Sequence, residues 1–83
     1  MTLEDLDLLK RAEDLILAIE LTSGEQFFAE IAIVVDQPPT PDVFLLRVNR
    51  EPDGAFTGAT NAGESILLDD ISRVAMIPGV AYT

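Results

Sequence analysis

The chain has 83 residues, enough for one domain with a modest core, and 48% of them are apolar, too many for a disordered acidic tail. It has 15 acidic side chains, five basic ones and a net charge of −10, which argues against nucleic acid and anionic membranes as partners, since both attract Lys and Arg. The absence of His and Cys excludes disulfides, thiol nucleophiles, histidine bases and zinc sites of the usual nitrogen and sulfur type.

The first predicted element is a short amphipathic helix over residues 3–13. Thr2 and Asp5 have the spacing of an approximate capping box, and acidic residues stand near the positive end of the helix dipole. The apolar positions recur at helical spacing, at Leu3, Leu6, Leu9 and Ala12. A helix this short is marginal in water, so we expect this stripe to pack on the domain's own core, with a partner protein as the alternative.

Two strands joined by a tight turn are predicted next. Residues 15–22 alternate so that Leu17, Ile19 and Leu21 share a buried face, and Ser23-Gly24-Glu25 supplies the turn. The second strand, residues 26–36, is apolar on both faces. One face is expected to carry Phe27, Ala29, Ile31, Ile33 and Val35, and the other Phe28, Glu30, Ala32 and Val34. Such a strand is predicted either to bend through a small barrel or to be covered by another subunit.

Three shorter strands complete the predicted domain. Prolines at 38, 39 and 41 end the second strand, because proline lacks the N–H that a sheet needs. A third strand over residues 43–50 is expected to point Phe44, Leu46 and Val48 inward. Residues 51–65 are predicted to form a loop, 66–68 a fourth strand, 69–71 a tight turn and 72–77 a fifth strand ended by Pro78-Gly79. With no internal repeat or boundary, residues 1–83 form one domain.

No catalytic, cofactor or metal site is predicted, and the chain is interpreted as not an enzyme. Its adjacent carboxylates, Glu13-Asp14 and Asp69-Asp70, lie at element boundaries, where turns and caps use such residues. Residues 49–54 begin with the spacing of a calcium loop. The twelfth position is Thr60 where a bidentate glutamate belongs, so calcium is rejected.

The order of these elements resembles the Sm-like family of small barrels. Residues 19–25 look like that family's first hairpin, and residues 66–74 like its closing strand, turn and strand. The resemblance implies a mainly β fold: a five-stranded Sm-like or SH3-like barrel over residues 15–77 with an N-terminal helix. Where the family binds RNA through Asp and Asn and then Arg-Gly, Asp36 is followed by Gln37-Pro38-Pro39, and Asp69-Asp70 replaces Arg-Gly. The resemblance therefore implies that this chain assembles into a ring through its strand edges, but not that it binds RNA.

One acidic branch of similar barrels, the Rho-inhibiting antiterminators, has an N-terminal helix and binds a protein in place of RNA. The leucine-rich acidic helix and the segment Leu68-Asp69-Asp70-Ile71 are similar to that branch. The resemblance implies a protein partner for this chain, recognised through acidic groups; the alternative is that the net charge serves only to keep the protein in solution.

The predicted function is therefore a non-enzymatic acidic interaction module that assembles with itself as a ring or other homo-oligomer, binds a basic protein, or both. Self-association suits a chain too short to be very stable alone. The interface candidates are Phe28, Glu30, Val34, Asp69 and Asp70. The alternative is an Sm-like RNA-binding ring protein, which needs Arg47, Arg50 and Arg73 gathered on one face. A structural component of a larger assembly is a further interpretation.

A cytoplasmic location is expected, and no membrane partner. The first residues lack the basic start and apolar run of a secretory signal, and no apolar stretch approaches the length of a membrane span.

Overall fold

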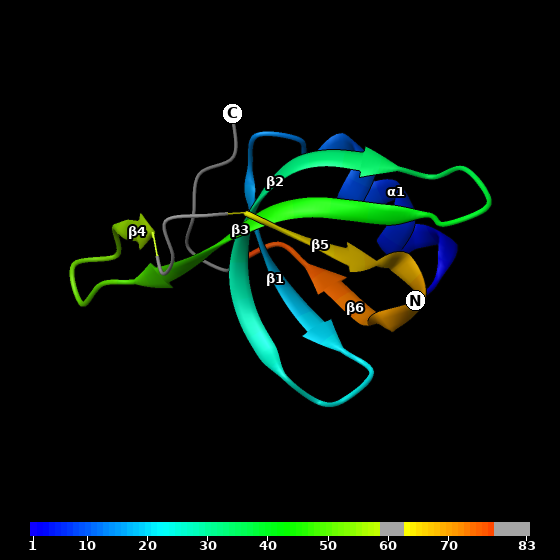
Figure 1. Ribbon diagram of the computed structural model, residues 1–83. Coiled ribbons are helices and arrows are strands. Elements are labelled where there is room, and N and C mark those ends of the chain that lie inside the picture. Colours follow the sequence, from blue (N-terminus) through cyan, green and yellow to red (C-terminus); the bar gives the residue numbers. More distant parts are fainter. Residues whose placement is uncertain (59–62, 78–83) are drawn as a thin grey trace.

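The structure is a computed structural model that describes residues 1–58 and 63–77, and it is mainly β with an N-terminal helix, as predicted (Figure 1). Helix α1 (Leu3–Arg11) is followed by β1 (Ile16–Leu21), β2 (Gln26–Val35), β3 (Asp42–Arg50), β4 (Phe56–Gly58), β5 (Glu64–Leu67), a 3-10 turn η1 (Leu68–Asp70) and β6 (Ile71–Ala75). No helix among these residues is long and apolar enough to cross a membrane. The predicted end of the last strand at Pro78-Gly79 lies outside the described residues.

The six strands form one open antiparallel sheet. Its order is β4-β3-β2-β1-β6, and β5 pairs with β3 over residues 42–45, beyond the part of β3 that pairs with β4. The prediction of five strands missed β4, whose residues were assigned to a loop. Residues 56–58 pair with 48–50 of β3, and this hairpin projects away from the rest of the sheet in Figure 1.

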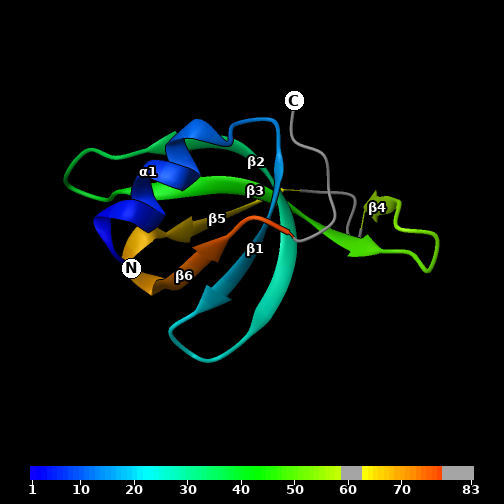
Figure 2. The ribbon, with the colours of Figure 1, turned by 180° about the vertical axis from the view of Figure 1, so that it is seen from behind.

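The helix begins at the predicted cap. Thr2 Oγ1 accepts from the Asp5 amide at 3.1 Å, and the Asp5 carboxylate accepts from the Thr2 amide at 3.0 Å, which closes the capping box. Leu9 and Ala12 are buried in the core, whereas Leu3 remains 84% exposed, so the predicted apolar stripe was wrong at its first position. The helix lies across one end of the sheet, in contact with β6 and β2 (Figure 2).

A β-bulge in β2 reverses the predicted faces of the residues that follow it, whereas the prediction is confirmed before it, at Ala29 and Ile31. Ile31 pairs with Leu45, yet Ile33 pairs with the next residue, Phe44, so β2 has one residue more than β3 at this point. Since side chains alternate along a strand, the extra residue turns Ile33 outward and packs Val34 against the core. The predicted placement of Ile33, Val34 and Val35 was therefore wrong.

The third strand was also assigned to the wrong face. Val43 and Leu45 are fully buried, while Phe44, predicted to point inward, is 42% exposed. By contrast, the alternation predicted for β1 is confirmed at Leu17 and Ile19.

The core consists of residues from the helix, all the long strands and the closing turn, namely Leu9, Ala12, Leu17, Ile19, Ala29, Ile31, Val43, Leu45, Leu68, Ile71 and Val74.

Glycine and carboxylate residues occupy the turns, as predicted for Gly24 and for Glu13-Asp14. Gly24 adopts φ +94° between β1 and β2, a conformation that L side chains rarely adopt. Asp14 has φ +70° between the helix and β1, and the Glu13 carboxylate accepts from the Val34 amide at 3.3 Å. In the β3–β4 hairpin, the Asp53 carboxylate accepts from the Ala55 amide at 2.9 Å. Among the described residues, no group of three carboxylates lies where it could hold a metal ion.

Candidate interaction surface

The face of the sheet turned away from the core carries four exposed apolar side chains, which we call the apolar patch: Ile33, Val35, Phe44 and Leu67. They lie in two cross-strand rows that each span β2, β3 and β5. One row is Ile33, Phe44 and Ser65, and the other is Val35, Asp42 and Leu67. The four side chains are exposed to between 42% and 56%. Aligned apolar side chains on an outer face are typical of a surface that meets a partner.

The exposed Phe44 ring lies against Gly63. A Cβ added to Gly63, just before β5, would lie 2.7 Å from Phe44 Cε1 and 3.2 Å from the Leu45 carbonyl oxygen. The Phe44 ring therefore occupies the space that a side chain at position 63 would need. Because residue 63 is a glycine, the Phe44 ring can lie beside the start of β5.

The edges of β6 and β5 differ in how they are covered. On β6, the helix packs against the strand, and Asp5 Oδ1 accepts from the Val74 amide at 3.2 Å. The Thr2 amide, and then the Thr2 hydroxyl and the Val74 amide, stabilise the Asp5 carboxylate and lower its pKa, although partial burial opposes them. The edge of β6 is thus covered in part by the protein itself.

The edge of β5 has no such cover among the described residues, where β5 pairs with β3 alone. The Leu68 amide donates to the Pro41 carbonyl oxygen at 3.0 Å, which identifies this pair as a hydrogen-bonded one. Hydrogen-bonded and non-hydrogen-bonded pairs alternate along an antiparallel ladder. The backbone groups of Ser65 and Leu67 therefore point away from β3, toward the free edge.

Most of the protein's cations are already engaged by its own groups. Lys10 pairs with Asp36 at 2.7 Å and Arg11 with Asp7 at 3.1 Å. Arg50 lies over the Phe56 ring at 5.7 Å.

Arg47 is the most strongly held cation. Its guanidinium pairs with Glu25 at 3.0 Å and with Glu64, and it lies 4.0 Å from the centre of the Phe27 ring. The bond from Arg47 lowers the pKa of Glu25, and the two carboxylates raise the pKa of Arg47. A side chain engaged on three sides in this way has little capacity left for a phosphate.

The carboxylates around the apolar patch remain uncompensated. Asp42 lies within the second row, Glu30 lies opposite Leu46 on the same outer face, and Asp69 and Asp70 follow β5 directly. None of these four forms an ion pair within the described part of the chain. The patch therefore has an acidic margin with no basic counterpart of its own.

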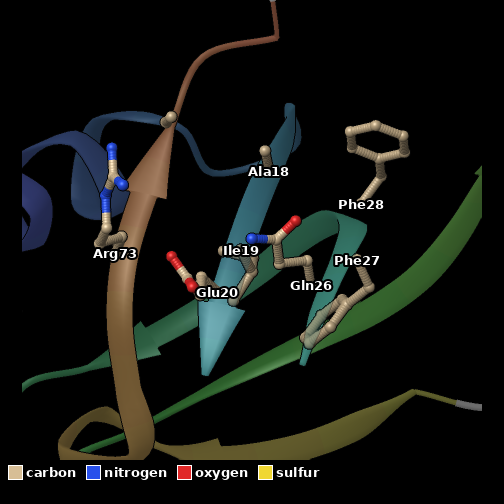
Figure 3. Close-up of a pocket in the computed structure, with 8 residues that line it drawn as sticks. Ala18, Ile19, Glu20, Gln26, Phe27, Phe28 and Arg73 are labelled. Atoms are coloured by element: carbon tan, nitrogen blue, oxygen red, sulfur yellow. The ribbon is translucent and has the colours of Figure 1, made fainter. Parts of the chain in front are cut away.

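A second feature of the outer face is a shallow hollow of about 400 Å³ over β6, β1 and β2 (Figure 3). Arg73 and Phe28 stand on its two sides with Glu20 and Gln26 between them, and the Phe27 ring points away. Arg73 and Glu20 are cross-strand neighbours but form no ion pair. The hollow thus combines one cation, one carboxylate and one amide with apolar side chains.

The residues predicted as interface candidates do not form one cluster. Phe28 and Glu30 share the outer face of β2, and the Phe28 ring meets the Phe56 ring edge-on at 6.0 Å between centroids. Val34 packs on the core instead. Asp69 and Asp70 are exposed in the turn after β5. Strict alternation along β2 places Ile33 and Val35 on the core face, so the sequence did not predict them as surface residues. No sequence signal at residues 31–33 indicates the bulge.

The three arginines of the RNA-binding alternative are not gathered on one face. Arg47 and Arg50 lie on opposite faces of β3, because three positions separate them along a strand. Arg73 lies on β6, at the other end of the strand order from β3.

Comparison of the chain with protein families, with curated proteins and with solved structures finds no match in any of the three.

Proposed function

We propose that this chain is a non-enzymatic, acidic, Sm-like interaction module that binds a basic protein partner. The observation that carries the proposal is the apolar patch at the free edge of β5, bordered by uncompensated carboxylates. An apolar surface favours burial against another protein, and its acidic margin selects partners with Lys or Arg and raises the rate of encounter.

Homo-oligomeric assembly is a second candidate, supported by the same free edge and patch. Two observations weigh against it. Each copy carries a net charge of −10, so identical copies repel one another at low salt. The edge of β6, which a ring closed by strand pairing would use, is covered in part by helix α1 and by the bond from the Val74 amide to Asp5. An RNA-binding ring has the least support, because Arg47 is neutralised by its own carboxylates.

Two measurements test the proposed function. The first is fluorescence anisotropy with three labelled probes: a seven-residue peptide of alternating Lys and Val, the same pattern with Glu in place of Lys, and a short single-stranded RNA. We expect binding of the Lys-Val peptide alone, with an affinity that falls as salt rises. Binding of the RNA but not the peptide would support the RNA-binding alternative.

The second measurement is the molar mass in solution by light scattering, over a range of concentrations and at moderate salt. A monomer that binds the basic peptide is the expected result. A stable ring of five or more copies that does not bind the peptide would refute the partner-binding proposal and support homo-oligomeric assembly.

A further inference from the structure

We propose that the basic partner docks by strand addition, contributing a short extended segment that pairs with the free edge of β5. This inference rests on the proposed function and specifies where and how the partner binds. Its first support is the contrast between the edges of β6 and β5: β6 is covered in part by the helix, whereas β5, like β4, has a hydrogen-bonded strand on one side only within residues 1–58 and 63–77. Edges left open usually carry Lys or Pro to prevent such pairing, and β5 (Glu64–Leu67) has neither.

The backbone of β5 provides a short docking site for a strand. Ser65 and Leu67 direct their N–H and C=O groups away from β3, so β5 offers two donors and two acceptors at this edge. An added strand lies about 4.8 Å away in the hydrogen-bonding direction. The backbone bonds supply affinity without demanding a particular sequence, which is the general character of strand addition.

The side chains of the outer face set the chemistry of the added segment. A strand next to β5 continues the two cross-strand rows, so its outward side chains lie beside Ser65 and Leu67. Leu67 and Phe44 favour an apolar side chain there. The uncompensated charges nearby, at Asp42 in the row and at Asp69 and Asp70 after the strand, favour Lys or Arg at the flanking positions. The occupant is thus an extended segment that combines apolar and basic residues.

The probe for the test is the labelled Lys-Val heptapeptide, compared with a version that is N-methylated on every amide so that it cannot donate hydrogen bonds along either edge. On the protein, Leu67→Lys places a charge in the patch, and Met76→Lys is its matched control. Met76 is 49% exposed against 43% for Leu67, and it follows β6 at the other end of the sheet. The control receives the same charge change away from β5.

A second pair of variants tests the backbone. Ser65→Pro removes an outward N–H that β3 does not use, so the internal ladder is retained. Ser65→Ala keeps that N–H and is its control. Circular dichroism and urea unfolding establish that each variant is folded before its affinity is compared.

We expect Leu67→Lys, Ser65→Pro and N-methylation each to weaken binding at least about tenfold, the loss expected from one or two hydrogen bonds or an apolar contact. Met76→Lys and Ser65→Ala should bind within about twofold of the parent chain. Hydrogen exchange at the Ser65 and Leu67 amides should slow when the peptide is bound.

Peptide binding that is indifferent to Leu67→Lys, Ser65→Pro and N-methylation would overturn strand addition while leaving the proposed function intact. Failure of the parent chain to bind any basic probe would overturn the proposed function itself. A concentration-dependent doubling of mass that Leu67→Lys abolishes would identify a second copy as the occupant and overturn the assignment to a basic partner.

Discussion

Replacement of Ile31 and Ile33, one at a time, tests the bulge that creates the apolar patch. Along a regular strand these two residues share a face and should respond alike. In the structure Ile31 is fully buried and Ile33 is 56% exposed. Truncation of a buried isoleucine to alanine costs about 2–5 kcal/mol, because apolar contacts are lost and a cavity remains. For Ile33→Ala we expect about 1 kcal/mol or less, since much of the side chain is already in water.

The size of the domain makes the conservative substitution the safer measurement. A chain of this length has a free energy of unfolding of about 4–12 kcal/mol, so Ile31→Ala is expected to consume a large part of it. Valine removes only one methylene, and we expect a loss of about 0.5–1.5 kcal/mol for Ile31→Val and less than about 0.5 kcal/mol for Ile33→Val.

Urea unfolding followed by far-UV circular dichroism measures these differences as changes in midpoint at constant slope. Light scattering on each variant ensures that the association state is the same, because self-association also changes apparent stability. Equal losses for the two positions would mean that Ile33 is buried like Ile31, and would refute both the bulge and the apolar patch that depends on it.

Three further predictions concern the polar contacts of the fold. Thr2→Ala should lower the free energy of unfolding by about 1 kcal/mol in urea titrations through loss of the helix cap, and Thr2→Ser should restore most of it; equal stability of all three chains would exclude a working cap. The folded-state pKa of Asp5 lies below its unfolded value, so its stabilisation is present above the unfolded pKa and is lost as pH falls through the folded pKa. The stability difference between the parent chain and Asp5→Asn should therefore shrink between about pH 6 and about pH 2, and a constant difference would contradict this linkage. Arg47→Lys should lower the urea midpoint, more at low salt than at high, because lysine cannot bridge Glu25 and Glu64 with a planar fork; an unchanged midpoint at low salt would show that the pair contributes nothing.

Elements encoded by neighbouring residues were predictable. The cap formed by Thr2 and Asp5, the alternation that buries Leu17 and Ile19, and the turn at Gly24 each depend on a few consecutive positions. Their signals are local side-chain hydrogen bonds, strand periodicity and the conformational freedom of glycine. The mainly β class with an N-terminal helix followed from these signals together.

The strand β4 was missed, although Pro52-Asp53-Gly54 before it is a local turn signal. Residues 56–58 lie in a stretch rich in Gly, Ala and Thr that has no strand periodicity. They become a strand because they pair with the end of β3 and because the Phe56 ring meets Phe28 and Arg50. Phe28 and Phe56 are distant in the sequence, and the pairing of residues 56–58 with β3 forms only within the sheet.

The sequence by itself determined the charge, the absence of His and Cys chemistry, the helix and the course of the longer strands, since composition and local periodicity suffice for these. Only the tertiary structure decided which apolar side chains face water. A single extra residue in β2, set by its pairing with β3, moves Ile33 and Val35 to the outer face beside Phe44 and Leu67. It also decided which edges stay open, because the helix packs on β6 and leaves β5, like β4, without a second hydrogen-bonded strand in the described sheet. Both outcomes depend on contacts between distant segments, and a one-residue change of register reverses every side chain that follows it.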